Sequence, residues 1–81
     1  MPLNDNELTD VYLMLAKNIR RYRRQNKLTQ KQLAIKSGYS YAYIRRLEAP
    51  GCIKNFSIQT IYNLAKCLDI DIKQLFETDD I

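Results

Sequence analysis

Five residues that favour the N-cap position of an α-helix each precede apolar residues spaced three or four apart. These caps are Asn4, Thr29, Ser40, Ser57 and Asp71. After Asn4, Thr29 and Asp71 a Glu or Gln follows three residues later, which completes a capping box. No stretch alternates polar and apolar residues over a useful length, so no sheet is expected. The pattern predicts an all-α, compact chain of five helices.

The first expected helix is the longest and spans residues 5–26, with Leu3 and Leu8 placed as a hydrophobic staple at its start. The second runs from the Thr29 cap to about Ser37, where Gly38 adopts the left-handed conformation that ends a helix. A third helix is expected to stop at Pro50 and Gly51, within a loop over 49–56. A fourth helix follows Ser57, and a short final helix follows Asp71. The acidic tail over 78–81 is expected to fray.

The size and residue content of the chain exclude several classes of protein. With 81 residues it is expected to form one domain over 1–81 and not a multidomain enzyme. It has no histidine, the commonest general base and metal ligand, and no nucleophile and base at a useful spacing. Cys52 and Cys67 belong to no C-x-x-C motif and are expected to be reduced thiols. We therefore expect no enzymatic activity, no metal and no cofactor.

The sequence also lacks signals for export or membrane insertion. Its longest apolar run, Val11 to Ala16, is far shorter than the roughly 20 residues needed to span a bilayer. The segment from Met1 to Asp10 has no basic region of the kind that begins a signal peptide. These observations predict a cytoplasmic protein that does not contact a membrane.

Positive charge is concentrated in the middle of the chain. Between Lys17 and Lys54 there are eleven basic residues and one acid, Glu48, so this span carries a net charge of +10 although the whole chain carries +4. A face of this kind is typical of proteins that bind polyanions, because each neutralised phosphate releases condensed counterions. A solvated helix face is the alternative, and charge alone does not separate the two.

The second and third expected helices, joined by the turn Ser37-Gly38-Tyr39, lie inside this basic span. Matching sequence continues on both sides, and the segments that carry it are Ile19–Arg23, Leu28–Ala34, Ser37–Ser40, Tyr43–Glu48, Ser57-Ile58, Leu64–Lys66, Leu68 and Leu75-Phe76. In this order and spacing they resemble the helix-turn-helix family of phage Cro and repressor proteins, the XRE family. The resemblance covers about residues 16–77, so that 4–15 is an extension of the first helix. It implies a lambda-repressor-like DNA-binding domain.

The resemblance also implies which residues read DNA bases. A helix-turn-helix places the start of its second helix against base edges in the major groove, and the matching positions here are Tyr41, Ala42, Arg45 and Arg46. Arg46 is suited to bind guanine O6 and N7, and Ala42 to contact a thymine methyl group. Tyr41 departs from the polar or basic residues usual at its position. For Arg45 and Arg46, contact with phosphates alone is the alternative.

Contacts to the DNA backbone are expected from residues around the reading helix, which are Gln30, Ser40, Tyr43, Lys54 and Asn55. Tyr43 has an alternative role in packing against the core. The loop that carries Lys54 and Asn55 is about two residues longer than is usual in the family. The resemblance further implies a structural ion pair between Arg23 and Glu48. Tyr39 takes the place of an aliphatic core residue and is expected to pack.

Together these features predict a sequence-specific, double-stranded-DNA-binding transcriptional regulator. The family commonly pairs through elements after the third helix, which implies a homodimer, a near-palindromic operator, and a dimer surface near Tyr62, Leu75 and Ile81. Repression is the expected mode of action. The alternatives are a restriction-modification controller, an antitoxin that binds a small protein partner through its N-terminal extension, and an RNA-binding protein that stacks bases on Tyr41 and Tyr43.

Overall fold

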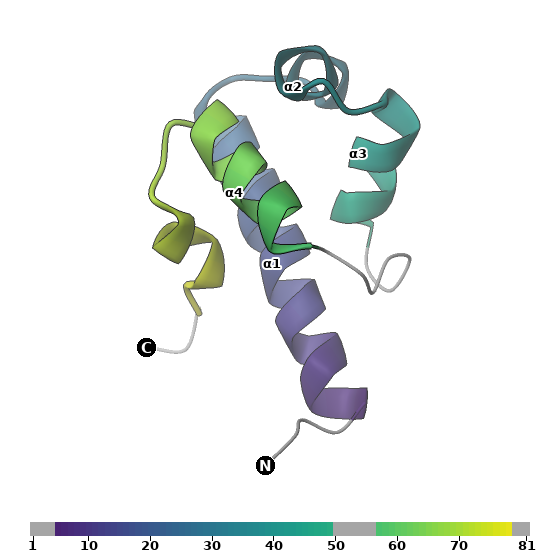
Figure 1. Ribbon diagram of the computed structural model, residues 1–81, viewed down its shortest axis with the longest axis vertical. Coiled ribbons are helices and arrows are strands. Elements are labelled where there is room, and N and C mark those ends of the chain that lie inside the picture. Colours follow the sequence, from purple (N-terminus) through teal and green to yellow (C-terminus); the bar gives the residue numbers. More distant parts are fainter. Residues whose placement is uncertain (1–4, 50–56, 79–81) are drawn as a thin grey trace.

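The computed structural model describes residues 5–49 and 57–78, and within these ranges it contains only helices and their connections (Figure 1). The elements are α1 (Asp5–Gln25), α2 (Gln30–Ser37), α3 (Tyr41–Glu48), α4 (Ile58–Cys67) and the 3-10 helix η1 (Ile72–Phe76). The all-α prediction is confirmed for the described residues. The prediction of five α-helices was wrong in one element, because η1 is a single short 3-10 helix.

Side-chain caps begin the helices where the sequence indicated. Thr29 accepts a hydrogen bond from the backbone N–H of Gln32, whose side chain accepts one from the Thr29 N–H. Ser40 and Ser57 cap α3 and α4. Asp71 and Gln74 form a second capping box, at η1. That element holds only five residues before Glu77 becomes extended, which favours the tighter 3-10 winding. The expected cap and staple at Asn4 and Leu3 lie outside the described residues.

Left-handed residues end three of the helices. Gly38 has φ +81° after α2, and its N–H donates to the carbonyl of Ala34, as the sequence predicted. Lys27 and Asp69 also have positive φ, 59° each, although neither is glycine. After each, an N–H reaches back five residues, from Leu28 to Arg23 and from Ile70 to Ala65. This bonding satisfies carbonyls at the ends of α1 and α4.

α1 packs against α3 on one side and η1 on the other, while α2 packs against α3 and α4, and the core forms between these elements (Figure 1). Its largest fully buried apolar side chains are Leu15, Ile19, Leu33, Ile44, Leu47, Leu64, Leu68 and Leu75. Tyr39 packs against this cluster, as expected, and its hydroxyl accepts a hydrogen bond from Asn63 on α4 at 3.1 Å. No helix in the described part of the chain is long and apolar enough to cross a membrane.

A buried amide joins η1 to α1. Asn18 is 1% exposed, and its Nδ2 donates to the carbonyls of Leu75 and Glu77, both at 2.8 Å. The Glu77 carboxylate also accepts hydrogen bonds from Tyr22 and from Arg21 of α1. These contacts hold the last described turn of the chain against the first helix.

Candidate nucleic-acid interface

The two faces of α3 differ sharply. Ile44 and Leu47 are 0% and 1% exposed and fix the helix to the core. The four residues expected to read bases, Tyr41, Ala42, Arg45 and Arg46, are all exposed. They form two pairs four positions apart, which places them on one side of a helix. The exposed side of α3 thus runs from Tyr41 and Ala42 in its first turn to Arg45 and Arg46 in its last turn, as one continuous surface.

Tyr41 is not isolated on this surface. The Nζ of Lys31, from α2, lies 5.4 Å from the centroid of the Tyr41 ring, and the guanidinium carbon of Arg45 lies 5.5 Å from it. Both distances fall within the range of cation–π attraction. The ring therefore brings a cation from each helix of the motif together at the exposed surface, a role that its sequence position did not reveal.

Arg23 and Glu48 form a bidentate ion pair that connects α1 to the end of α3. The Nε and Nη2 of Arg23 lie 2.7 and 2.9 Å from the two Glu48 oxygens, and both residues are buried. Arg23 also donates to the Leu28 carbonyl at 2.7 Å, and Gln30 donates to Glu48 at 3.1 Å. The pair therefore fixes the orientation of α3 relative to α1 and to the beginning of α2.

The residues expected to contact phosphates have different surroundings. Gln30 begins α2, but its amide is bonded to Glu48, a link that the sequence did not indicate. The hydroxyl of Ser40 accepts a hydrogen bond from the Tyr43 N–H. The half-buried Tyr43 ring packs against the core, 5.2 Å from the Tyr39 ring, which is the alternative that the sequence left open. Lys54 and Asn55 lie outside the described residues.

A groove runs between α1, the start of α2 and the end of α3. Its volume is about 580 Å³, and it is lined by Arg20, Arg23, Arg24, Thr29, Gln30, Arg45, Glu48 and Ala49. We call it the arginine groove. Arg20 and Arg24 were not among the expected site residues. Their spacing of four on an expected helix, inside the basic span, was the available signal.

A short helix that follows a left-handed turn, is fixed by its apolar face and exposes basic residues on the opposite side is the architecture of a helix-turn-helix DNA-binding protein. The chain matches the model of the helix-turn-helix family HTH_3 over residues 19–75. It therefore belongs to this family. Its members bind DNA and regulate transcription, and they are not enzymes.

Individual relatives agree with this assignment. The chain is 37% identical to the control protein C.SmaI of Serratia marcescens over 75 residues, which cover 93% of this chain and 87% of that protein. Its fold is similar to the restriction-modification controller protein C.AhdI of Aeromonas hydrophila, with a TM-score of 0.73, 32% identity, and coverage of 80% and 96%. A hypothetical transcription factor of Neisseria, NHTF, gives a TM-score of 0.78, 26% identity, and coverage of 98% and 86%. These structural neighbours support the expected lambda-repressor-like fold.

Proposed function

We propose that this regulator binds a near-palindromic DNA operator as a homodimer and controls a restriction-modification system. The observation that carries sequence-specific binding is the exposed face of α3, on which Arg45 and Arg46 stand beside Tyr41 and Ala42. Arg46 binds guanine in the major groove, and Ala42 contacts a thymine methyl group. The ion pair of Arg23 with Glu48 holds the helix in the orientation that this reading requires.

The control of a restriction-modification system is inferred from the relatives. C.SmaI is named a control protein and C.AhdI a restriction-modification controller, and the match to each spans most of both chains. We propose repression as the mode of action, since a dimer bound over a promoter excludes RNA polymerase. A reporter with the selected operator upstream of its start site tests this. Expression of the protein lowers reporter output under repression and raises it under activation.

The proposed homodimer pairs through α4. Ile58 and Tyr62 lie four residues apart on this helix and are 69% and 49% exposed, so α4 presents an apolar surface. To bind a near-palindromic operator, a dimer paired there must hold its two copies of α3 about 34 Å apart, one turn of DNA. Sedimentation equilibrium tests the interface. We expect Tyr62→Glu to yield monomers, whereas Ile35→Glu, at an exposed apolar residue of α2, leaves the dimer intact.

DNA binding is tested by selection from a random duplex pool at about 150 mM salt, followed by titration of the best site. We expect a near-palindromic site with half-sites about 10 base pairs apart. Arg46→Ala should lose about 1–3 kcal/mol of binding free energy for each half-site and relax the preference at one base pair in each. Lys73→Ala, on η1 across α1 from α3, is the control and should bind as the wild type does. Failure to enrich any sequence contradicts the proposal.

A second candidate function is the binding of a protein partner by the N-terminal extension. Leu8 and Leu13 of α1 are 39% and 37% exposed, and the first turns of α1 project beyond the other elements (Figure 1). Co-purification of a specific small protein from the native host, lost in the variant Leu8→Ser/Leu13→Ser with DNA binding retained, would favour this function.

A further inference from the structure

The arginine groove contains more arginine side chains than carboxylates to pair with them. Arg20, Arg23, Arg24 and Arg45 line it, and Glu48 is the one acid among its described lining residues. Both oxygens of Glu48 are bonded to Arg23, and one also accepts from Gln30. Arg20, Arg24 and Arg45 are therefore left without a carboxylate from the described groove lining.

This arrangement costs folding free energy. Arg20 and Arg24 stand four residues apart on α1, a spacing at which like charges repel on a helix surface. Arg20 is half-buried, which makes screening by solvent less complete than for a fully exposed pair. A bound anion removes the repulsion and adds charge-assisted hydrogen bonds.

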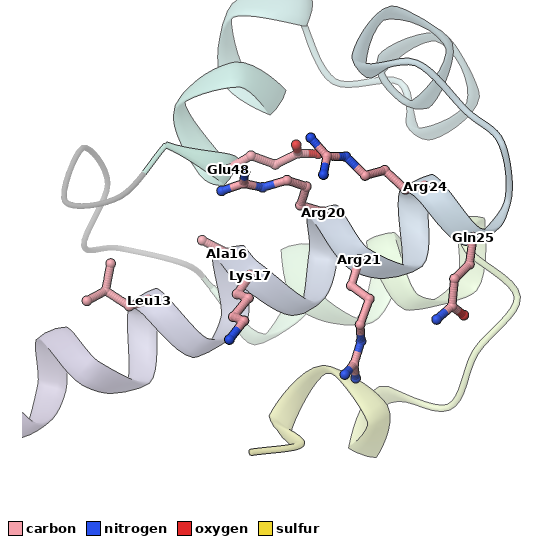
Figure 2. A pocket seen from close by; sticks show the side chains of 8 residues that line it. All are labelled: Leu13, Ala16, Lys17, Arg20, Arg21, Arg24, Gln25 and Glu48. Atoms are coloured by element: carbon pink, nitrogen blue, oxygen red, sulfur yellow. The ribbon is translucent and has the colours of Figure 1, made fainter. Parts of the chain in front are cut away.

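The position of the two arginines is set by α1. In Figure 2 the side chains of Arg20 and Arg24 extend from α1 toward Glu48 on α3, whereas Arg21 points to the opposite side of the helix. Arg20, Arg24 and Glu48 also line an adjoining hollow of about 750 Å³ along α1. The cationic surface thus continues from the end of α3 onto the first helix.

The groove is also next to the surface that reads DNA. Arg45 belongs both to the groove and to the exposed face of α3. Thr29 and Gln30, at the start of α2, line another side of it, where helix N–H groups and the helix dipole favour an anion. In helix-turn-helix complexes the helix before the reading helix crosses the DNA backbone, so a backbone strand is expected near the start of α2, which lines this groove.

We propose that Arg20 and Arg24 of α1 bind phosphates of the DNA backbone in the arginine groove, so that the first helix is part of the DNA-binding surface. This inference rests on the proposed function and adds to it a second set of contacts. The two guanidinium groups hold the backbone strand that flanks the half-site read by α3. They fix the register of the protein on DNA and carry no base preference of their own.

The test is the salt dependence of binding to the selected operator, measured for the wild type and for Arg20→Gln/Arg24→Gln. Each lost phosphate contact lowers the magnitude of the slope of log K against log salt by about 0.9, so two contacts in each protomer of the proposed homodimer lower it by about 3.6. Between about 50 and 200 mM salt, the affinity advantage of the wild type should therefore shrink about 150-fold. The ratio of specific to non-specific binding should stay unchanged.

Two control variants separate a local contact from general charge and folding effects. Lys73→Gln removes a charge from η1, on the far side of α1, and should keep the wild-type slope. Arg20→Lys/Arg24→Lys preserves both charges and should restore most of the slope. Circular dichroism checks the fold, and the glutamine variant should melt no lower than the wild type because it relieves repulsion.

Each outcome has a distinct meaning. If the wild type selects an operator and the glutamine variant loses slope relative to Lys73→Gln, the inference stands. If the wild type selects an operator but Arg20→Gln/Arg24→Gln and Lys73→Gln show the same salt slope, Arg20 and Arg24 do not bind phosphate. In that case only the further inference fails. If the wild type selects no DNA sequence, the proposed function fails and this inference fails with it.

Discussion

Glu48 shows how one buried acid organises a basic surface. It lies among eleven cationic residues of the central span, yet its carboxylate faces inward to Arg23 and Gln30. Desolvation of two charges offsets much of their attraction, so a buried pair contributes more to geometry than to stability. Here the geometry is the angle between α1 and α3.

Removal of only one partner of this pair should be costly. We expect Glu48→Met to lower the free energy of unfolding by about 3–5 kcal/mol, because Arg23 keeps a buried charge without its carboxylate. In Arg23→Met/Glu48→Met both charges are gone, and the loss should be smaller than in the single variant. Urea unfolding of the two variants measures the difference. An equal or larger loss in the double variant contradicts this account.

Asn18 joins two elements in a similar way, but through hydrogen bonds between neutral groups. Asn18→Leu keeps a side chain of similar size but leaves the carbonyls of Leu75 and Glu77 without the amide that they bind. We expect a loss of about 2 kcal/mol of unfolding free energy, since buried acceptors lose their partner. Gln25→Leu, at an exposed site near the end of α1, is the control and should change stability little. Thermal or urea unfolding distinguishes the two.

The turn between α2 and α3 depends on the backbone of Gly38. A Cβ atom there would meet nothing within 4 Å, so any cost of a side chain arises from φ of +81° and not from crowding. Gly38→Ala should therefore lose about 1–2 kcal/mol. Gly38→Asn should lose less, because asparagine tolerates the left-handed region. If both variants unfold at the wild-type urea concentration, the turn does not require glycine.

The sequence predicted the elements whose signals are local. Thr29, Ser40 and Ser57 begin helices because each cap accepts a hydrogen bond from an N–H three residues later. The left-handed Lys27 and Asp69 carried no such signal, since neither residue type marks a helix end as glycine does. The winding of η1 was also missed, because a cap and an apolar pattern do not distinguish a short 3-10 helix from an α-helix.

The candidate site also combines features that local sequence predicts with features that depend on packing between elements. The exposed face of α3 follows from helical spacing within eight residues, so its composition was readable in the sequence. The arginine groove joins residues of α1, α2 and α3, and it exists only because α1 packs beside α3. The bond of Gln30 to Glu48 spans 18 positions and depends on the same packing. Of these contacts between elements, the ion pair of Arg23 with Glu48 was expected from the family resemblance, whereas the bond of Gln30 to Glu48 and the assembly of the arginine groove had no signal in the sequence pattern.

The uneven charge of the protein should make its stability respond to salt even without DNA. We expect an increase from about 20 to about 300 mM NaCl to raise the melting temperature by about 3 °C, because screening weakens repulsion within the basic span. The rise should be smaller in Arg20→Gln/Arg24→Gln. Differential scanning calorimetry of the two proteins measures it. A melting temperature that falls with added salt contradicts the expected repulsion.

The bond between Asn18 and η1 has a consequence for the newly made protein. The carbonyls that Asn18 binds are translated 57 and 59 residues after it. At about 5–20 residues per second, synthesis of the chain from Asn18 to these two residues takes about 3–12 seconds, and during this time α1 lacks η1 as a cover. Meanwhile α2 and α3, which are neighbours in sequence, have local contacts that form early. Until η1 has been made and has left the ribosome, the nascent chain offers an uncovered apolar flank of α1 to chaperones.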